Sequence, residues 1–153
     1  MNAVVLQAVV VFLAGLLAGE EFIVRYGLQP ALRHLDDRAH VAARVALVRT
    51  LRIVVPAIMI PTVLTGAAML IVSGGGDGAG FRWAGVAALV AFVLFSFLGT
   101  VPINIKVIEW DADNPPPDWR ATVLRWQRID VLRSTAAIVA FLCVVIALAA
   151  QVP

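Results

Sequence analysis

Four long apolar stretches constrain this 153-residue chain more than any other feature of its sequence. They run over residues 3–24, 53–72, 83–105 and 131–152. The hydrocarbon core of a bilayer is about 30 Å thick, so a helix of about 20 mostly apolar residues crosses it. Backbone groups in lipid must bond one another, and no stretch shows the alternation of a barrel strand. We therefore predict an all-α, polytopic membrane protein whose single domain, residues 1–153, is a bundle of four transmembrane helices.

The composition argues against several other classes of protein. Hydrophobic residues make up 61% of the chain and charged residues only 14%, whereas soluble domains carry about 25% charged residues. This disfavours a water-soluble enzyme, a disordered segment and a nucleic-acid-binding module, for which the net charge of +2 is also too small. One cysteine, Cys143, and two histidines are too few for a disulfide or an ordinary zinc site. We expect no metal and no nucleic-acid partner.

The connections between the stretches predict an orientation in the membrane. Residues 73–82 are a short turn in which glycine supplies positive φ at no steric cost. The two long connections, residues 25–52 and 106–133, hold every lysine and arginine except Arg82. With four spans they share one face, which the positive-inside rule makes cytoplasmic, so both termini lie outside the plasma or inner membrane. The first stretch lacks a basic leader and a clear cleavage site, and we read it as a retained helix.

Local signals place the helix ends. Asp36 or Asp37 can cap a helix that continues into the second span, and Asp118 can cap one that runs into the fourth. The second and fourth helices should therefore extend beyond the membrane on the cytoplasmic side. Gly27 and Pro30 should interrupt the helix that follows the first span.

The informative polar side chains enter the apolar spans near the charged connections, and the opposite half of the spans has almost none. They are Glu20, Glu21, Arg49, Arg52, Ser96, Thr100, Asn104, Trp126, Asp130 and Arg133. An ionisable group inside a membrane costs about 2.5–3.5 kcal/mol on insertion scales and by default marks function. Acids and arginines at matched depth can offset one another and build a polar pocket between helices. Such a pocket suits a small, flat, mostly apolar molecule that carries a few oxygens.

The charged members of this set also have structural interpretations. Glu21 can pair with Arg25 one helical turn later, whereas Glu20 has no such partner and is the better functional candidate. Arg44 and Arg25 lie where long side chains reach lipid headgroups, and Arg52 at the edge of its span can do the same.

The uncharged members have structural interpretations too. Ser96 and Thr100 can bond the preceding helical turn, as hydroxyls in helices often do. The Asn104 side chain can bond a backbone group that lacks its helical partner because of the nearby proline. Trp126 can lie at the membrane interface. Asp130 can pair with the arginine three residues later.

Three groups of segments give the chain a likeness to a known family. They are residues 19–27 with 35–37, residues 51–57, and residues 101–104 with 110, 115–119 and 125–133. On these segments the chain resembles the anthrone oxygenase-like family of small four-helix membrane proteins. The combination of Pro102-x-Asn104 with a later Trp126-x6-Arg133 is the most specific. Family members commonly have histidine, sometimes asparagine, where this chain has Asp130.

The resemblance implies oxidation of a polycyclic phenol or anthrone by O2 without a cofactor. The methylene of an anthrone is acidic because its anion is aromatic, and that anion can give an electron to oxygen directly. Glu20 or Asp130 would take the proton. Arg133 and Asn104 would hold the developing oxyanion, and Trp126 would stack on the rings. The other expected substrate contacts are Arg52, Thr100, Ser96 and Glu21.

Two other functions compete with this one. The polar side chains could fix only helix register, in a protein that binds a lipid, a quinone or a partner protein. They would then be paired with one another around no void. A transporter would need a polar path through the outer half of the bundle, which the sequence lacks. The sequence leaves a homo-oligomer open.

Overall fold

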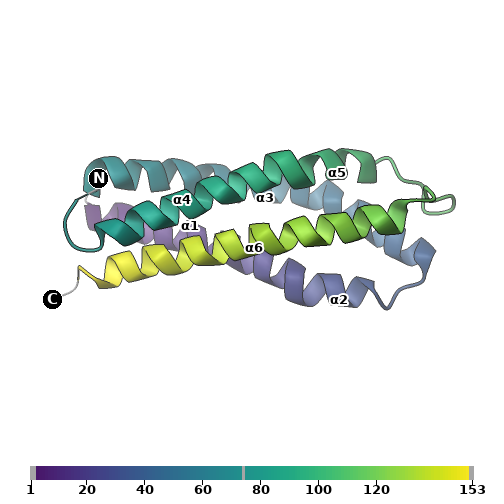
Figure 1. Ribbon diagram of the computed structural model, residues 1–153, viewed down its shortest axis with the longest axis horizontal. Coiled ribbons are helices and arrows are strands. Elements are labelled where there is room, and N and C mark those ends of the chain that lie inside the picture. Colours follow the sequence, from purple (N-terminus) through teal and green to yellow (C-terminus); the bar gives the residue numbers. More distant parts are fainter. Residues whose placement is uncertain (1–2, 74, 152–153) are drawn as a thin grey trace.

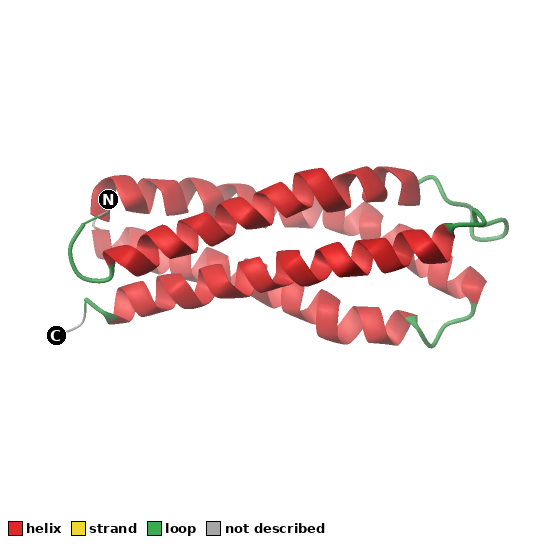
Figure 2. Ribbon diagram, in the orientation of Figure 1, coloured by secondary structure: helices red, strands yellow, loops and turns green. Residues whose placement is uncertain are grey.

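The computed structural model describes residues 3–73 and 75–151, and the regular structure in those ranges is helical throughout (Figure 2). The elements are α1 (Ala3–Ile23), η1 (Val24–Leu28), α2 (Gln29–Leu32), α3 (Asp37–Ser73), α4 (Ala79–Phe95), η2 (Ser96–Thr100), α5 (Val101–Val107) and α6 (Trp119–Ala149). They join into four rods, residues 3–32, 37–73, 79–107 and 119–149, each long and apolar enough to cross a membrane. This confirms the predicted four-helix membrane bundle. Val152, the predicted end of the last span, lies outside the described residues.

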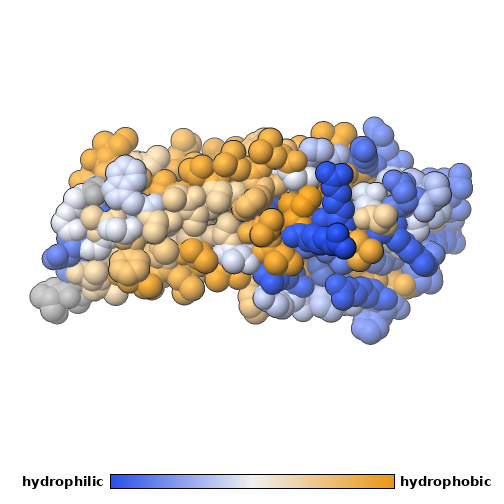
Figure 3. Space-filling view, in the orientation of Figure 1, coloured by the Kyte–Doolittle hydropathy of each residue, from blue (hydrophilic) through white to orange (hydrophobic). Residues whose placement is uncertain are grey.

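The rods lie side by side, with both ends of the chain beside the short glycine-rich connection and the long connections at the opposite end (Figure 1). α4 packs most extensively on α6, and α1 packs on α6 and α3. Hydrophilic side chains gather at the end with the long connections, whereas most of the remaining visible surface is hydrophobic (Figure 3). We call this hydrophilic end the charged end.

All four rods, of 30, 37, 29 and 31 residues, are longer than the about 20 residues that a bilayer requires, so the extension predicted for the second and fourth helices is shared by the other two. At a rise of 1.5 Å per residue, the 37 residues of α3 span about 55 Å and the 31 of α6 about 46 Å. Arg120 of α6 donates to Asp37 of α3 over 2.6 Å, beyond the apolar stretches. The backbone N–H of Ala39 donates to the Asp36 carboxylate over 2.8 Å, as predicted for a cap. Asp118 precedes α6 but its side chain makes no cap hydrogen bond.

The short turn depends on glycine as expected. Gly76 and Gly78 have φ values of +78° and +75°, and a Cβ at Gly78 would lie 2.7 Å from the Ala147 carbonyl oxygen. The buried Arg82 side chain donates to the carbonyl oxygen of Asp77 over 2.9 Å and so holds the turn against α4.

The expected interruption after the first span is wrong. The rod continues through a π-helical turn, η1, into α2, where Pro30 occupies the first turn and its missing N–H costs little. The third rod has the same arrangement, with η2 directly before α5 and Pro102 in the first turn of α5. Single π-helical turns are frequent at functional sites.

The buried core forms separate clusters along the bundle. One joins Leu17, Met59 and Phe92, and another, at the charged end, joins Val107, Trp119 and Trp126. The buried polar side chains of the candidate set lie between these two clusters.

Candidate functional site

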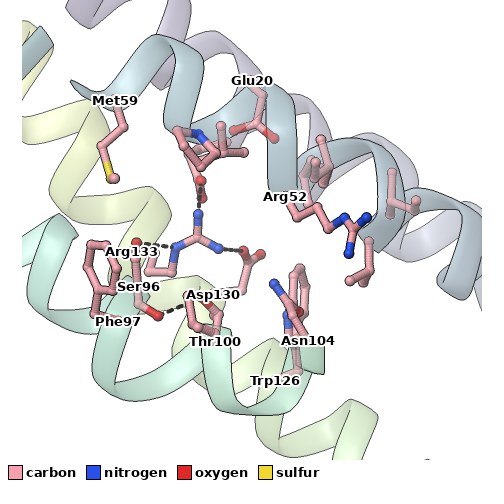
Figure 4. A pocket seen from close by; sticks show the side chains of 18 of the residues that line it. Glu20, Arg52, Met59, Ser96, Phe97, Thr100, Asn104, Trp126, Asp130 and Arg133 are labelled. Atoms are coloured by element: carbon pink, nitrogen blue, oxygen red, sulfur yellow. Dashed lines mark hydrogen bonds and ion pairs between the residues drawn. The ribbon is translucent and has the colours of Figure 1, made fainter. Parts of the chain in front are cut away.

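The candidate side chains share one cavity. Its volume is about 260 Å³, close to the lower end of the about 300–1,000 Å³ typical of small-molecule sites. The nine residues proposed from the sequence as substrate contacts or catalytic groups all line it: Glu20, Glu21, Arg52, Ser96, Thr100, Asn104, Trp126, Asp130 and Arg133. Much of the remaining wall is apolar and includes Val55, Met59 and Phe97 (Figure 4).

Helical spacing explains how the rods bring these groups together. Trp126, Asp130 and Arg133 are four and three residues apart, so they lie on one face of α6. Gly99 allows η2 to approach that face, because a Cβ at Gly99 would lie 2.5 Å from Cγ2 of Ile129. This close approach brings the Ser96 hydroxyl within hydrogen-bond distance of Arg133.

Arg133 is the centre of a buried network that we call the Arg133 cluster. Its Nη2 donates to Glu21 Oε1 over 2.5 Å and its Nε to Ser96 Oγ over 3.0 Å. Its Nη1 lies 3.9 Å from Asp130 Oδ1, which is an ion pair without a hydrogen bond. The guanidinium carbon also lies 5.0 Å from the centroid of the Phe92 ring. Side chains of three rods are therefore joined by one cation (Figure 4).

The predicted pairing of Glu21 with Arg25 is wrong. Glu21 binds Arg133, and Arg25 instead donates to the hydroxyls of Ser134 and Thr135 over 3.1 and 3.2 Å. The π-helical turn η1 begins between Glu21 and Arg25, so the two side chains no longer stand one regular turn apart.

The hydroxyls on the third rod bond as the structural interpretation expected. Ser96 donates to the Phe92 carbonyl oxygen over 2.7 Å, and Thr100 donates to the Ser96 carbonyl oxygen over 3.1 Å. Ser96 differs from Thr100 because its oxygen also accepts from Arg133. It is therefore part of the Arg133 cluster, whereas Thr100 is a polar part of the wall.

Asn104 is oriented by Trp126. The indole Nε1 donates to Asn104 Oδ1 over 3.0 Å. Because an indole N–H can only donate, the atom facing it must be the amide oxygen, which leaves the Asn104 NH2 group as a donor. Trp126 is buried rather than placed at an interface, and the Arg44 guanidinium lies 5.2 Å from its ring centroid.

Arg44 is the cavity residue that the sequence analysis missed. We expected it to reach lipid headgroups, but it is only 2% exposed and donates to Gln29 Oε1 over 2.8 Å. The reason is that α3 continues past the apolar stretch, so this part of it is covered by α2 and α6. A signal was present, because Arg44, Val48 and Arg52 stand four residues apart on one face of α3 and all line the cavity.

Several buried oxygens in the cavity wall have no donor. Among the described residues, Glu20 Oε2, Glu21 Oε2 and Asp130 Oδ1 make no hydrogen bond. A buried acceptor without a donor is costly. The wall is therefore suited to a ligand that donates hydrogen bonds from hydroxyl groups. Within the described ranges, no three His, Cys, Asp or Glu side chains are grouped to hold a metal ion.

Comparison with known proteins places the chain in a family. A family model described as anthrone oxygenase matches residues 43–143, which include seven of the nine candidate residues but neither Glu20 nor Glu21. The searches of curated proteins and of solved structures found no match. Since the matched residues make up more than half of the chain, this protein belongs to the anthrone oxygenase family.

Proposed function

We propose that this protein oxidises a small polycyclic phenol or anthrone with O2 in the cavity between its helices. One observation carries the proposal. In a chain of the anthrone oxygenase family, carboxylates, an amide and guanidinium groups from all four rods line a single, mostly apolar cavity. A hydrocarbon-lined site within a membrane suits the reaction, because the aromatic substrate and O2 both dissolve in the bilayer.

The chemistry balances without a further reactant. A carboxylate removes one proton from the substrate methylene and leaves an aromatic oxyanion. This anion gives an electron to O2, and the two radicals combine to form a peroxide at the former methylene carbon. The carboxylic acid returns its proton to the peroxide, and loss of water then leaves a carbonyl and the carboxylate in its starting state. One oxygen atom ends in the ketone and the other in water, so the CH2 carbon is oxidised and O2 is reduced.

Glu20 is the proposed base. It lies half-buried at the end of α1 and forms no ion pair within the described residues, and its Oε2 has no donor. Asp130 is the second candidate, but it already lies 3.9 Å from Nη1 of Arg133. Of the two carboxylates, Glu20 is therefore the one that is in no ion pair and is left to take the proton.

The oxyanion would be held by fixed donors. The Asn104 NH2 group is oriented by the Trp126 bond, and Arg133 adds positive charge although two of its nitrogens already bind Glu21 and Ser96. Donors that are already in place in a low-dielectric site stabilise developing charge more than water does. Trp126 would stack on the substrate rings with the part of its own ring that Arg44 leaves uncovered.

The cellular arrangement is also part of the proposal. Residues 1–153 would act as one membrane domain, with the charged end in the cytoplasm and both termini outside the plasma or inner membrane. The concentration of arginine at the charged end supports this orientation.

A non-enzymatic function has an observation of its own. The Arg133 cluster and the Trp126–Asn104 bond show that much of the polar set is satisfied within the protein. Such a set would also stabilise a protein that binds a lipid or a quinone in the same cavity, with no reaction.

Turnover separates the two functions. Purified protein in lipid nanodiscs is mixed with anthrone and O2, and anthraquinone is followed by its absorbance against empty nanodiscs. We expect acceleration by the natural protein and its loss in Glu20→Gln. The matched control is Glu109→Gln, which changes an exposed acid outside the cavity. Equal rates for the natural protein and empty nanodiscs would refute the enzymatic function.

A further inference from the structure

The cavity is closed along the bundle but open on one side. Toward the charged end it is bounded by the buried side chains of Trp126 and Arg44, and toward the termini by Met59. Three other lining side chains are exposed on the outside of the bundle: Phe97 by 57%, Val101 by 36% and Ile105 by 57%. Arg52 of α3 is exposed as well. A side chain that both lines a cavity and faces outward marks the opening.

This opening, formed by Arg52, Phe97, Val101 and Ile105, is here called the mouth. It lies between α3 on one side and η2 with α5 on the other. These rods are weakly packed there, since α3 packs much less closely on α5 than on α1. Three of the four residues of the mouth are apolar and belong to a rod that is apolar enough to cross a membrane. The mouth therefore faces hydrocarbon rather than water.

Arg52 is the polar residue of the mouth. Its side chain makes no hydrogen bond or ion pair with any other described residue, and it extends on the side of the drawn space away from Arg133 (Figure 4). Glu20 lines the same cavity, and its Oε2 has no donor. The cavity is therefore bordered by the Arg52 guanidinium, a donor that has no acceptor, and by Glu20 Oε2, an acceptor that has no donor. A ligand that fits between them carries a hydroxyl and an acidic or carbonyl oxygen.

We infer that aromatic ligands reach the cavity sideways from the bilayer through the mouth, and that Arg52 there binds an acidic oxygen of the ligand. The inference deepens the proposed function, since it assumes that the cavity holds the substrate. It adds the route by which the substrate enters, and it assigns Arg52 as the residue that selects ligands with an acidic oxygen. An unpaired guanidinium bordered by hydrocarbon attracts an ionised oxygen more strongly than one in water.

The route is tested by binding kinetics, without turnover. In nanodiscs of phosphatidylcholine, 2-hydroxyanthraquinone is added and its quenching of tryptophan fluorescence is followed by stopped flow. Val101→Phe narrows the mouth and should slow association and dissociation together by about tenfold, with little change in Kd. Phe97→Ala widens it and should raise both rates. The matched control is Leu98→Phe, at a 78% exposed position of η2 that does not line the cavity.

Two results would overturn the route. One is that Val101→Phe and Phe97→Ala leave both rates at the natural values. The other is that Val101→Phe weakens binding without slowing association. The substitution would then act on the bound ligand and not on its passage through the mouth. Equal slowing by Leu98→Phe would also count against the mouth.

The role of Arg52 is tested with two ligands that differ in one group. The natural protein should bind 2-hydroxyanthraquinone about tenfold more tightly than 2-methoxyanthraquinone, which has no acidic oxygen. Arg52→Gln should abolish this preference and Arg52→Lys should keep part of it. Arg125→Gln removes an exposed arginine outside the cavity and should leave the preference unchanged.

Each outcome separates this inference from the proposed reaction. If Arg52→Gln keeps the full preference, Arg52 contacts lipid headgroups and its assigned role is wrong. If neither anthraquinone binds, the inference fails as a whole. If the preference depends on Arg52 but no anthrone is oxidised, the inference stands and the enzymatic function falls.

Discussion

Replacing Arg133 with methionine removes the cation that holds two buried carboxylates. The change keeps a long unbranched side chain but deletes the guanidinium over Phe92, the 2.5 Å bond to Glu21, the 3.0 Å bond to Ser96 and the ion pair with Asp130. Glu21 and Asp130 are 1% and 2% exposed, so water cannot replace the arginine. Removing one partner of a buried ion pair typically costs about 3–5 kcal/mol. We expect Arg133→Met to lower the free energy of unfolding by that amount.

A second substitution tests this reasoning. Glu21→Gln should recover at least about 2 kcal/mol in the Arg133→Met background, because it removes one of the uncompensated charges. Unfolding is followed by circular dichroism in mixed micelles with increasing SDS. Arg128→Met, at an exposed position of α6, should change stability by less than about 0.5 kcal/mol. The reasoning is refuted if Arg133→Met behaves like Arg128→Met, or if the double variant is no more stable than Arg133→Met.

Three further predictions follow from local geometry. Asn104→Leu removes the amide donor and should reduce anthrone turnover by about 10–100-fold, measured as anthraquinone formation, and normal turnover would exclude Asn104 from the reaction. Gly99→Ala forces a Cβ to within 2.5 Å of α6 and should lower SDS-unfolding stability by about 1–3 kcal/mol, whereas Gly80→Ala, with open space around it, should not destabilise. Asp36→Ala deletes the cap of α3 and should cost about 1 kcal/mol in the same assay, while Asp118→Ala, which loses no cap bond, should cost clearly less.

Much of the fold could be predicted because its determinants are local. Span length, hydropathy and the proline-rich connection each act within a short segment, and together they define four helices. Helical spacing alone puts Trp126, Asp130 and Arg133 on one face. That the nine candidate side chains line one cavity follows from their similar depth in the membrane. Their roles in a reaction stay predictions.

The errors come from features that depend on packing between rods. Arg44 looked like an interfacial arginine because the sequence does not show that α2 and α6 cover that part of α3. The partner of Glu21 was missed because a π-helical turn changed the spacing to Arg25. The interruption expected at Gly27 did not occur, since the same turn lets the rod continue to Pro30. The spacing of Arg44 from Val48 and Arg52 was a signal for the first of these, whereas the effects of the π-helical turn are not visible from residue types alone.

Proton removal by Glu20 is the first step of the proposed reaction, and it can be measured without oxygen. Under argon in D2O, exchange of the anthrone methylene hydrogens is followed by mass spectrometry in nanodiscs that contain the protein. We predict faster exchange than in empty nanodiscs, with the acceleration lost in Glu20→Gln and kept in Glu109→Gln. Exchange no faster than in empty nanodiscs, or equally fast with Glu20→Gln, would contradict the assignment of Glu20 as the base in this cavity.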